Sequence, residues 1–109
     1  METKKLFLVH CGFYDSEISD GVYESHVNYM VVADSFDDAR VQVRLHPEFA
    51  KKKMHVDGMQ WIEAVNGFKV QLKRDPAYEG QSRISTKKHR DFATAKPAAS
   101  FVDPQPSSN

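Results

Sequence analysis

The sequence predicts a two-layer α+β domain, in which one helix covers one face of a four-stranded antiparallel sheet. Three observations support this fold. Residues 5–14 form an apolar run too short for a helix, a capped helical pattern follows residue 35, and Asn66–Gly67 is a hairpin signal. The predicted domain spans residues 4–75 of the 109 in the chain, an ordinary length for one domain.

The first strand is predicted at residues 5–14, KLFLVHCGFY. This run is apolar at both odd and even positions. Strands of that kind are typically covered on both faces, so we expect this one at the centre of the sheet. At an edge it would promote aggregation.

The second strand is predicted at residues 26–33, after a polar loop that contains the turn signal Asp20–Gly21. Alternate side chains of a strand project from opposite faces. Both faces of this strand are apolar, with Val27, Tyr29 and Val31 on one face and Met30 and Val32 on the other.

The pattern becomes helical after residue 34. Ser35 is a favourable N-cap, and Asp38 stands three residues later, as in a capping box. Pro47 marks the end of the helical pattern. The helix is therefore predicted over residues 36–46, followed by a polar connector.

The third and fourth strands are predicted to form a hairpin. Residues 54–65 should be the third strand, kinked or bulged at Gly58, and residues 68–72 alternate apolar with polar side chains. Asn66–Gly67 suits a two-residue type I′ turn. Such a turn sets the register, with Val65 opposite Phe68 and Glu63 opposite Val70.

These elements predict the order of the strands in the sheet. The central first strand lies between the second and third, which gives the order 2-1-3-4 with all neighbours antiparallel. Residues 76–109 are rich in Pro, Ser, Ala and charge, and are predicted to be a largely disordered tail.

Composition narrows the classes of function. The formal net charge is zero, which argues against nucleic acid as a partner. No apolar stretch is long enough for a membrane span. Cys11 is the one cysteine, so no internal disulfide can form, and a reducing cytoplasm is the expected compartment.

Several short motifs occur together in one order: KLFLVHCGF, a Glu-x-His (Glu24, His26) before an apolar strand, VADSFDDA, HVD at residues 55–57, and VNGFKV. With these motifs, residues 5–72 resemble the bacterial domain of unknown function 1543 family. The resemblance implies a small bacterial α+β domain, found singly or in tandem, and implies no particular activity.

One polar set is a candidate ligand-binding site. In the order 2-1-3-4 the second and third strands run parallel, so their first residues lie at the same end of the sheet. His10 and Cys11 approach that end as well. The set comprises Glu24, His26, His55 and Asp57. Histidine and carboxylate are natural partners for proton transfer or metal binding. The alternative is ordinary hydrogen bonding at strand ends, with Asp57 and Gly58 shaping a bulge.

Two other residues have a chemical and a structural interpretation. Cys11 could be a nucleophile with His10 or His26 as its base, but a lone cysteine on an apolar strand is more often buried and inert. Trp61 is expected to be an anchor in the core or in an interface rather than a stacking platform.

One helix covers only one face of a sheet, and the other face is also apolar. We therefore expect self-association as a symmetric homodimer, packed sheet to sheet through the candidate interface residues Met30, Val32 and Ile62. The alternatives are that the C-terminal tail covers this face, or that a tandem-like hetero-partner does.

The function predicted from these observations is a non-enzymatic binding or interaction module. The alternative is a small-molecule-binding protein or an enzyme that uses the His/Asp cluster. No cofactor and no metal are predicted, because no complete catalytic or metal-binding motif occurs. A pocket lined by the cluster would favour the alternative.

Overall fold

The structure is a computed structural model that describes residues 3–93. The chain divides into two compact units, Met1–Leu72 and Lys73–Asn109. The first ends close to the boundary of the predicted domain.

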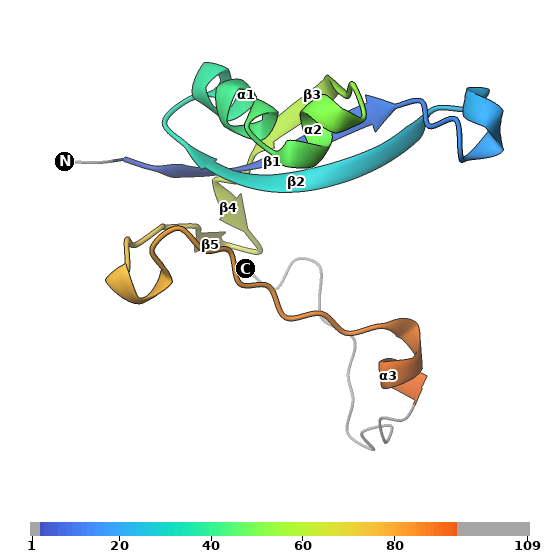
Figure 1. Cartoon of the computed structure of the whole chain (residues 1–109). Coiled ribbons are helices and arrows are strands. Elements are labelled where there is room, and N and C mark those ends of the chain that lie inside the picture. The colour runs from blue at the N-terminus through green and yellow to red at the C-terminus, as the bar shows by residue number, and fades with distance from the viewer. Residues whose placement is uncertain (1–2, 94–109) are drawn as a thin grey trace. The chain divides into compact units, whose positions relative to one another are not determined.

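The first unit contains a three-stranded antiparallel sheet. Its strands are β1 (Lys5–Phe13), β2 (Ser25–Ala33) and β3 (His55–Trp61), in the order β2-β1-β3 (Figure 1). The α+β class is confirmed, as is the central place of the first strand. The loop between β1 and β2 contains the 3₁₀ turn η1 (Ser19–Gly21).

Helix α1 (Phe36–Arg44) begins where its cap predicts. Ser35 Oγ accepts a hydrogen bond from the Asp38 N–H at 3.1 Å, and Asp38 Oδ2 accepts one from the Asp34 N–H at 2.9 Å. The helix ends two residues before the predicted end. The connector after it was wrongly predicted, because a second helix, α2 (Pro47–Lys51), begins at Pro47. Proline suits the first turn of a helix, since its missing N–H would have no intrahelical partner there.

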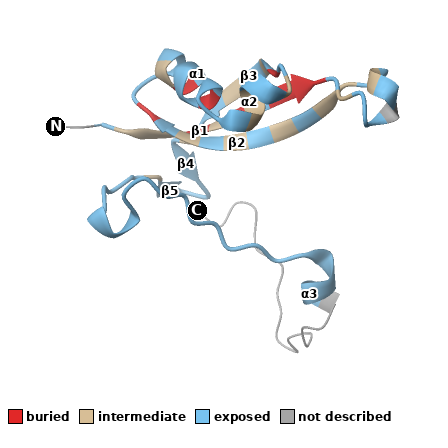
Figure 2. Cartoon of the chain, viewed as in Figure 1, coloured by how far each residue is buried: buried red, intermediate tan, exposed pale blue. Residues whose placement is uncertain are grey.

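The hydrophobic core lies between the sheet and α1 (Figure 2). Alternate residues of β1 supply half of it, and α1 adds two side chains. The buried residues are Phe7, Val9, Cys11, Phe13, Ala33, Ala39, Val43 and Met54. We call the opposite face of the sheet the open face. Met30 is 54% exposed on it and Val32 is 52% exposed.

A β-bulge in β3 decides which side chains reach the open face. His10 pairs with Gly58 and Cys11 pairs with Val56, so Asp57 is an extra residue with no partner in β1. A bulge shifts the alternation of side chains by one. His55 and Asp57 therefore project from the open face, whereas Met59 packs against the core. The bulge was predicted one residue later, at Gly58.

The predicted hairpin forms, but it does not extend the sheet. Strands β4 (Ala64–Val65) and β5 (Phe68–Lys69) make a two-stranded sheet of their own. Asn66 (φ 53°) and Gly67 (φ 86°) both have the positive φ of a type I′ turn. The register is confirmed, because Val65 pairs with Phe68, and the Val70 N–H donates to Glu63 O at 2.9 Å.

The four-stranded order 2-1-3-4 is thus not confirmed in the part of the chain that the structure describes. Strand β3 runs antiparallel to β1, and the Ile62 N–H donates to Leu6 O at 2.9 Å. At that point β3 has reached the start of β1 at Lys5. Residues 63–65 therefore continue past the sheet, and the hairpin built on them pairs only with itself.

The second unit contains the 3₁₀ turn η2 (Pro76–Tyr78) and a short helix, α3 (His89–Ala93). Asp75 Oδ1 caps η2 by accepting a hydrogen bond from the Ala77 N–H at 3.0 Å. These turns lie within the segment predicted to be a disordered tail. The rest of that prediction, residues 94–109, lies outside the described residues.

Candidate functional site

The four predicted site residues converge on the open face. His26 Nε2 lies 2.8 Å from Glu24 Oε1 and 3.1 Å from Asp57 Oδ2. His55 Nε2 lies 2.6 Å from Glu24 Oε2 and 3.0 Å from Asp57 Oδ1. Each carboxylate therefore bridges the two imidazoles, and the four groups form a closed ring. We call Glu24, His26, His55 and Asp57 the His/carboxylate cluster.

The register of the sheet explains this convergence. His26 on β2 and His55 on β3 are both partners of Gly12 on the central strand. The two histidines therefore flank β1 at the same level. Glu24 reaches the same place from the residue before β2, and the bulge in β3 adds Asp57 beside His55.

Gly12 provides the space in which the cluster forms. A Cβ atom on Gly12 would lie 2.6 Å from Asp57 Oδ2, 2.7 Å from Glu24 Oε2 and 2.8 Å from His55 Nε2. Gly12 is buried although it faces the open side, because the cluster covers it. Gly12 is not among the site residues predicted from the sequence. The available signal was a glycine inside an apolar strand, which often marks a close approach.

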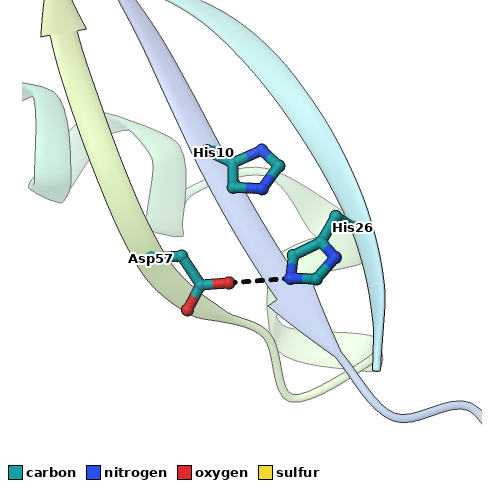
Figure 3. A group of neighbouring side chains, drawn as sticks. All are labelled: His10, His26 and Asp57. Atoms are coloured by element: carbon teal, nitrogen blue, oxygen red, sulfur yellow. Dashed lines mark ion pairs between the residues drawn. The ribbon is translucent and has the colours of Figure 1, made fainter. Parts of the chain in front are cut away.

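His10 extends the cluster along β1. Its ring stacks on that of His26, with centroids 4.8 Å apart and planes 8° from parallel. Its Nδ1 lies 2.6 Å from Asn28 Oδ1. Figure 3 shows His10, His26 and Asp57 on three neighbouring strands, with the His26–Asp57 ion pair marked. Asn28 was not selected from the sequence either.

The side chains of the cluster are partly open to solvent. Exposure of its side chains ranges from 27% for Glu24 to 46% for His55. A shallow depression lies beside it, lined by Leu8, His10, Asn28, Gly58, Met59 and Gln60. None of the four cluster residues lines that depression, and their polar atoms contact one another instead.

Cys11 lies on the other side of the sheet from the cluster. Its side chain is fully buried in the core. Burial, followed by the nearby negative charge of Asp57, raises the pKa of the Cys11 thiol. Both effects disfavour the thiolate, which is the nucleophilic form. The structure therefore supports the buried and inert interpretation of Cys11.

Of the candidate interface residues, Met30 and Val32 are exposed on the open face, and Ile62, the residue after β3, is half-buried. Trp61 was expected to be an anchor in the core or in an interface; it is 38% exposed, so it does not belong to the core of this chain. Its ring lies under the Lys5 ammonium, with Nζ 5.3 Å from the centroid, and it lines a groove together with Leu6 and Leu72.

Comparison of the chain with protein families, with curated proteins and with solved structures finds no match. Within residues 3–93, no helix is long and apolar enough to cross a membrane. The fold and the cluster therefore define the chain only as a small α+β domain with a His/carboxylate cluster on its open face.

Proposed function

We propose that this chain is a non-enzymatic binding module that works in the cytoplasm and presents the open face of its sheet to a partner. The observation that carries the proposal is that, within the first unit, helix α1 covers one face of the sheet, while Met30 and Val32 remain more than half exposed on the other. Exposed apolar patches on small domains usually mark interfaces. The resemblance to the domain of unknown function 1543 family agrees with a module of this size.

The proposed partner is a second copy of the chain. An apolar patch that contains Met30, Val32 and Ile62 can pack against the same patch of a symmetry-related copy. Two sheets stacked face to face would remove both patches from water. A neutral chain also carries no net charge to oppose such association.

Light scattering after size exclusion tests this partner. The unaltered chain is expected to have the mass of a dimer at micromolar concentration, and Met30→Lys should reduce it to a monomer with the fold retained. Val41→Lys is the matched control, because Val41 is an exposed valine on α1, away from the open face. A monomer mass for the unaltered chain that persists on concentration would refute the dimer.

The second candidate function is binding or conversion of a small molecule at the His/carboxylate cluster. It is favoured by the convergence of four polar side chains over Gly12. A thermal-shift screen over nucleotides and metabolites tests it. A compound that stabilises the chain but not a His26→Ala variant would support this candidate over a purely structural cluster.

A further inference from the structure

We propose that the His/carboxylate cluster is a binding site for a divalent transition metal ion, of which Zn²⁺ is the representative. The two histidines and two carboxylates would hold the ion above Gly12. This inference is independent of the proposed dimer, since each ligand comes from a single copy of the chain.

The four N···O contacts of the cluster have too few hydrogens for each to be a full hydrogen bond. Each Nε2 atom of His26 and His55 lies within hydrogen-bond distance of two carboxylate oxygens. A ring nitrogen carries at most one hydrogen, and a carboxylate only accepts. The four N···O contacts therefore share at most two hydrogens, so each Nε2–H is divided between two carboxylate oxygens and no more than two of the contacts can be full hydrogen bonds. A cation at the centre would turn all four groups into ligands.

The distances between the nitrogen and oxygen atoms of the cluster also suit a bound metal ion. Zn²⁺ is held at about 2.0–2.2 Å by nitrogen and oxygen ligands, which in a tetrahedral site places neighbouring ligand atoms roughly 3.3–3.6 Å apart. The four N···O distances run from 2.6 to 3.1 Å. Only a small outward movement of the side chains would admit an ion.

The backbone at Gly12 gives a further reason to infer a binding site. Gly12 lies in an extended strand and is not among the glycines with positive φ. Its conformation therefore does not require glycine. A glycine weakens a strand, yet here the missing Cβ is what allows Glu24, His55 and Asp57 to meet. The strand is shaped to hold these groups together.

Surrounding residues would support the ligands. The His10 ring stacks against His26 and fixes its plane. The Asn28 side-chain oxygen accepts a hydrogen bond from His10 Nδ1. In the neutral His10 ring, Nε2 is then a hydrogen-bond acceptor, and it lies on the side of His26 and Asp57. Atoms of these three residues lie within 4.8 Å of one another. His10 would therefore be a positioning residue for the site.

The ligand types select the class of metal. Imidazole nitrogen combined with carboxylate oxygen suits Zn²⁺ and neighbouring first-row ions, whereas Mg²⁺ and Ca²⁺ prefer oxygen alone. Cys11 does not contribute a thiolate, because it is buried in the core. Side-chain exposure up to 46% leaves room for water to complete the coordination.

The test is calorimetric titration of the full chain, stripped with a chelator, with Zn²⁺ and separately with Mg²⁺. We expect saturable binding of one Zn²⁺ per chain, a higher melting temperature with Zn²⁺, and no comparable effect of Mg²⁺. His55→Ala should weaken Zn²⁺ binding by more than about 100-fold, since loss of a mere supporting residue typically costs 10–100-fold. His46→Ala is the control, because His46 is an exposed histidine that contacts Tyr29 outside the cluster.

Circular dichroism of each metal-free variant separates loss of binding from loss of fold. If His55→Ala does not fold, Glu24→Gln answers the same question, because it keeps the size of the side chain and removes its charge. Absence of saturable Zn²⁺ binding to the unaltered chain would overturn the proposal. Equal affinity in the cluster variants and the control would overturn it as well, and would assign the cluster to a histidine–carboxylate network without metal.

Discussion

Gly12 lies directly beneath the carboxylate of Asp57, and a Cβ atom on Gly12 would be 2.6 Å from Asp57 Oδ2. The two residues are 45 positions apart in the sequence. They meet because β1 and β3 are neighbours and because the bulge in β3 turns Asp57 toward the open face. Any residue other than glycine at position 12 would push the His/carboxylate cluster apart.

Gly12→Ala is therefore expected to weaken Zn²⁺ binding while leaving the domain folded. The atoms that the new methyl group would meet are the ends of flexible side chains, which can rotate away. Calorimetry should show affinity reduced by at least about tenfold, the lower limit for losing outer support. Gly58→Ala is the control, because nothing lies within 4 Å of its added Cβ. Equal Zn²⁺ affinity in the two variants would contradict the role of Gly12.

Phe7→Ala should destabilise the domain more than Trp61→Ala does. Phe7 is fully buried and packs edge-on against Phe36 at a centroid distance of 5.0 Å, and such truncations cost about 3–5 kcal/mol. Trp61 is 38% exposed, so its removal takes less surface from the core. Urea unfolding measures both changes. A greater loss for Trp61→Ala would show that this side chain is covered by a partner in solution.

The cap of α1 should give stability a dependence on pH. A hydrogen bond from the Asp34 N–H, followed by one from the Gln42 side chain, lowers the pKa of the Asp38 carboxyl below its ordinary 3.8. A lowered folded-state pKa stabilises the fold above the ordinary value, and the stabilisation is lost as pH falls through the folded-state pKa. Asp38→Asn should therefore reduce the free energy of unfolding at neutral pH and make little difference in acid.

Asp37→Asn is the control for that measurement, since Asp37 lies in the same first turn. It shares the favourable position near the helix dipole but accepts neither of the two hydrogen bonds that lower the Asp38 pKa. Equal losses of unfolding free energy at neutral pH in the two variants would attribute the effect to the helix dipole alone.

Ser35→Ala, which removes the N-cap acceptor, should lower the free energy of unfolding by about 1 kcal/mol.

Truncation after Gly80 should leave the cooperative unfolding transition nearly unchanged. Among residues 3–93, the buried core residues all lie between Phe7 and Met54, and the first compact unit ends at Leu72. Thermal unfolding followed by circular dichroism compares the truncated chain with the full one. A large fall in melting temperature would show that the removed residues dock on the domain.

Local signals were enough to predict much of the fold. The apolar run of β1, the alternation in β2, the Ser35 cap and the Asn66–Gly67 turn each act within a few residues, and the structure confirms each of them. The central place of β1 followed from its two apolar faces. That placement predicted that the first residues of β2 and β3 would meet at one end of the sheet.

The sequence by itself therefore determined the three strands of the sheet, helix α1, the antiparallel neighbours of β1 and the choice of the four side chains of the candidate site, but not helix α2. Only the tertiary structure decided that Asp57 is the bulged residue, that β3 ends where β1 begins, and that Gly12 supplies the space beneath the cluster. The physical reason is that these features depend on the pairing of strands distant in sequence. The periodicity of a sequence predicts the face of its strand from which each side chain projects. The space available to that side chain depends on the residue paired with it on the neighbouring strand, which the periodicity does not predict.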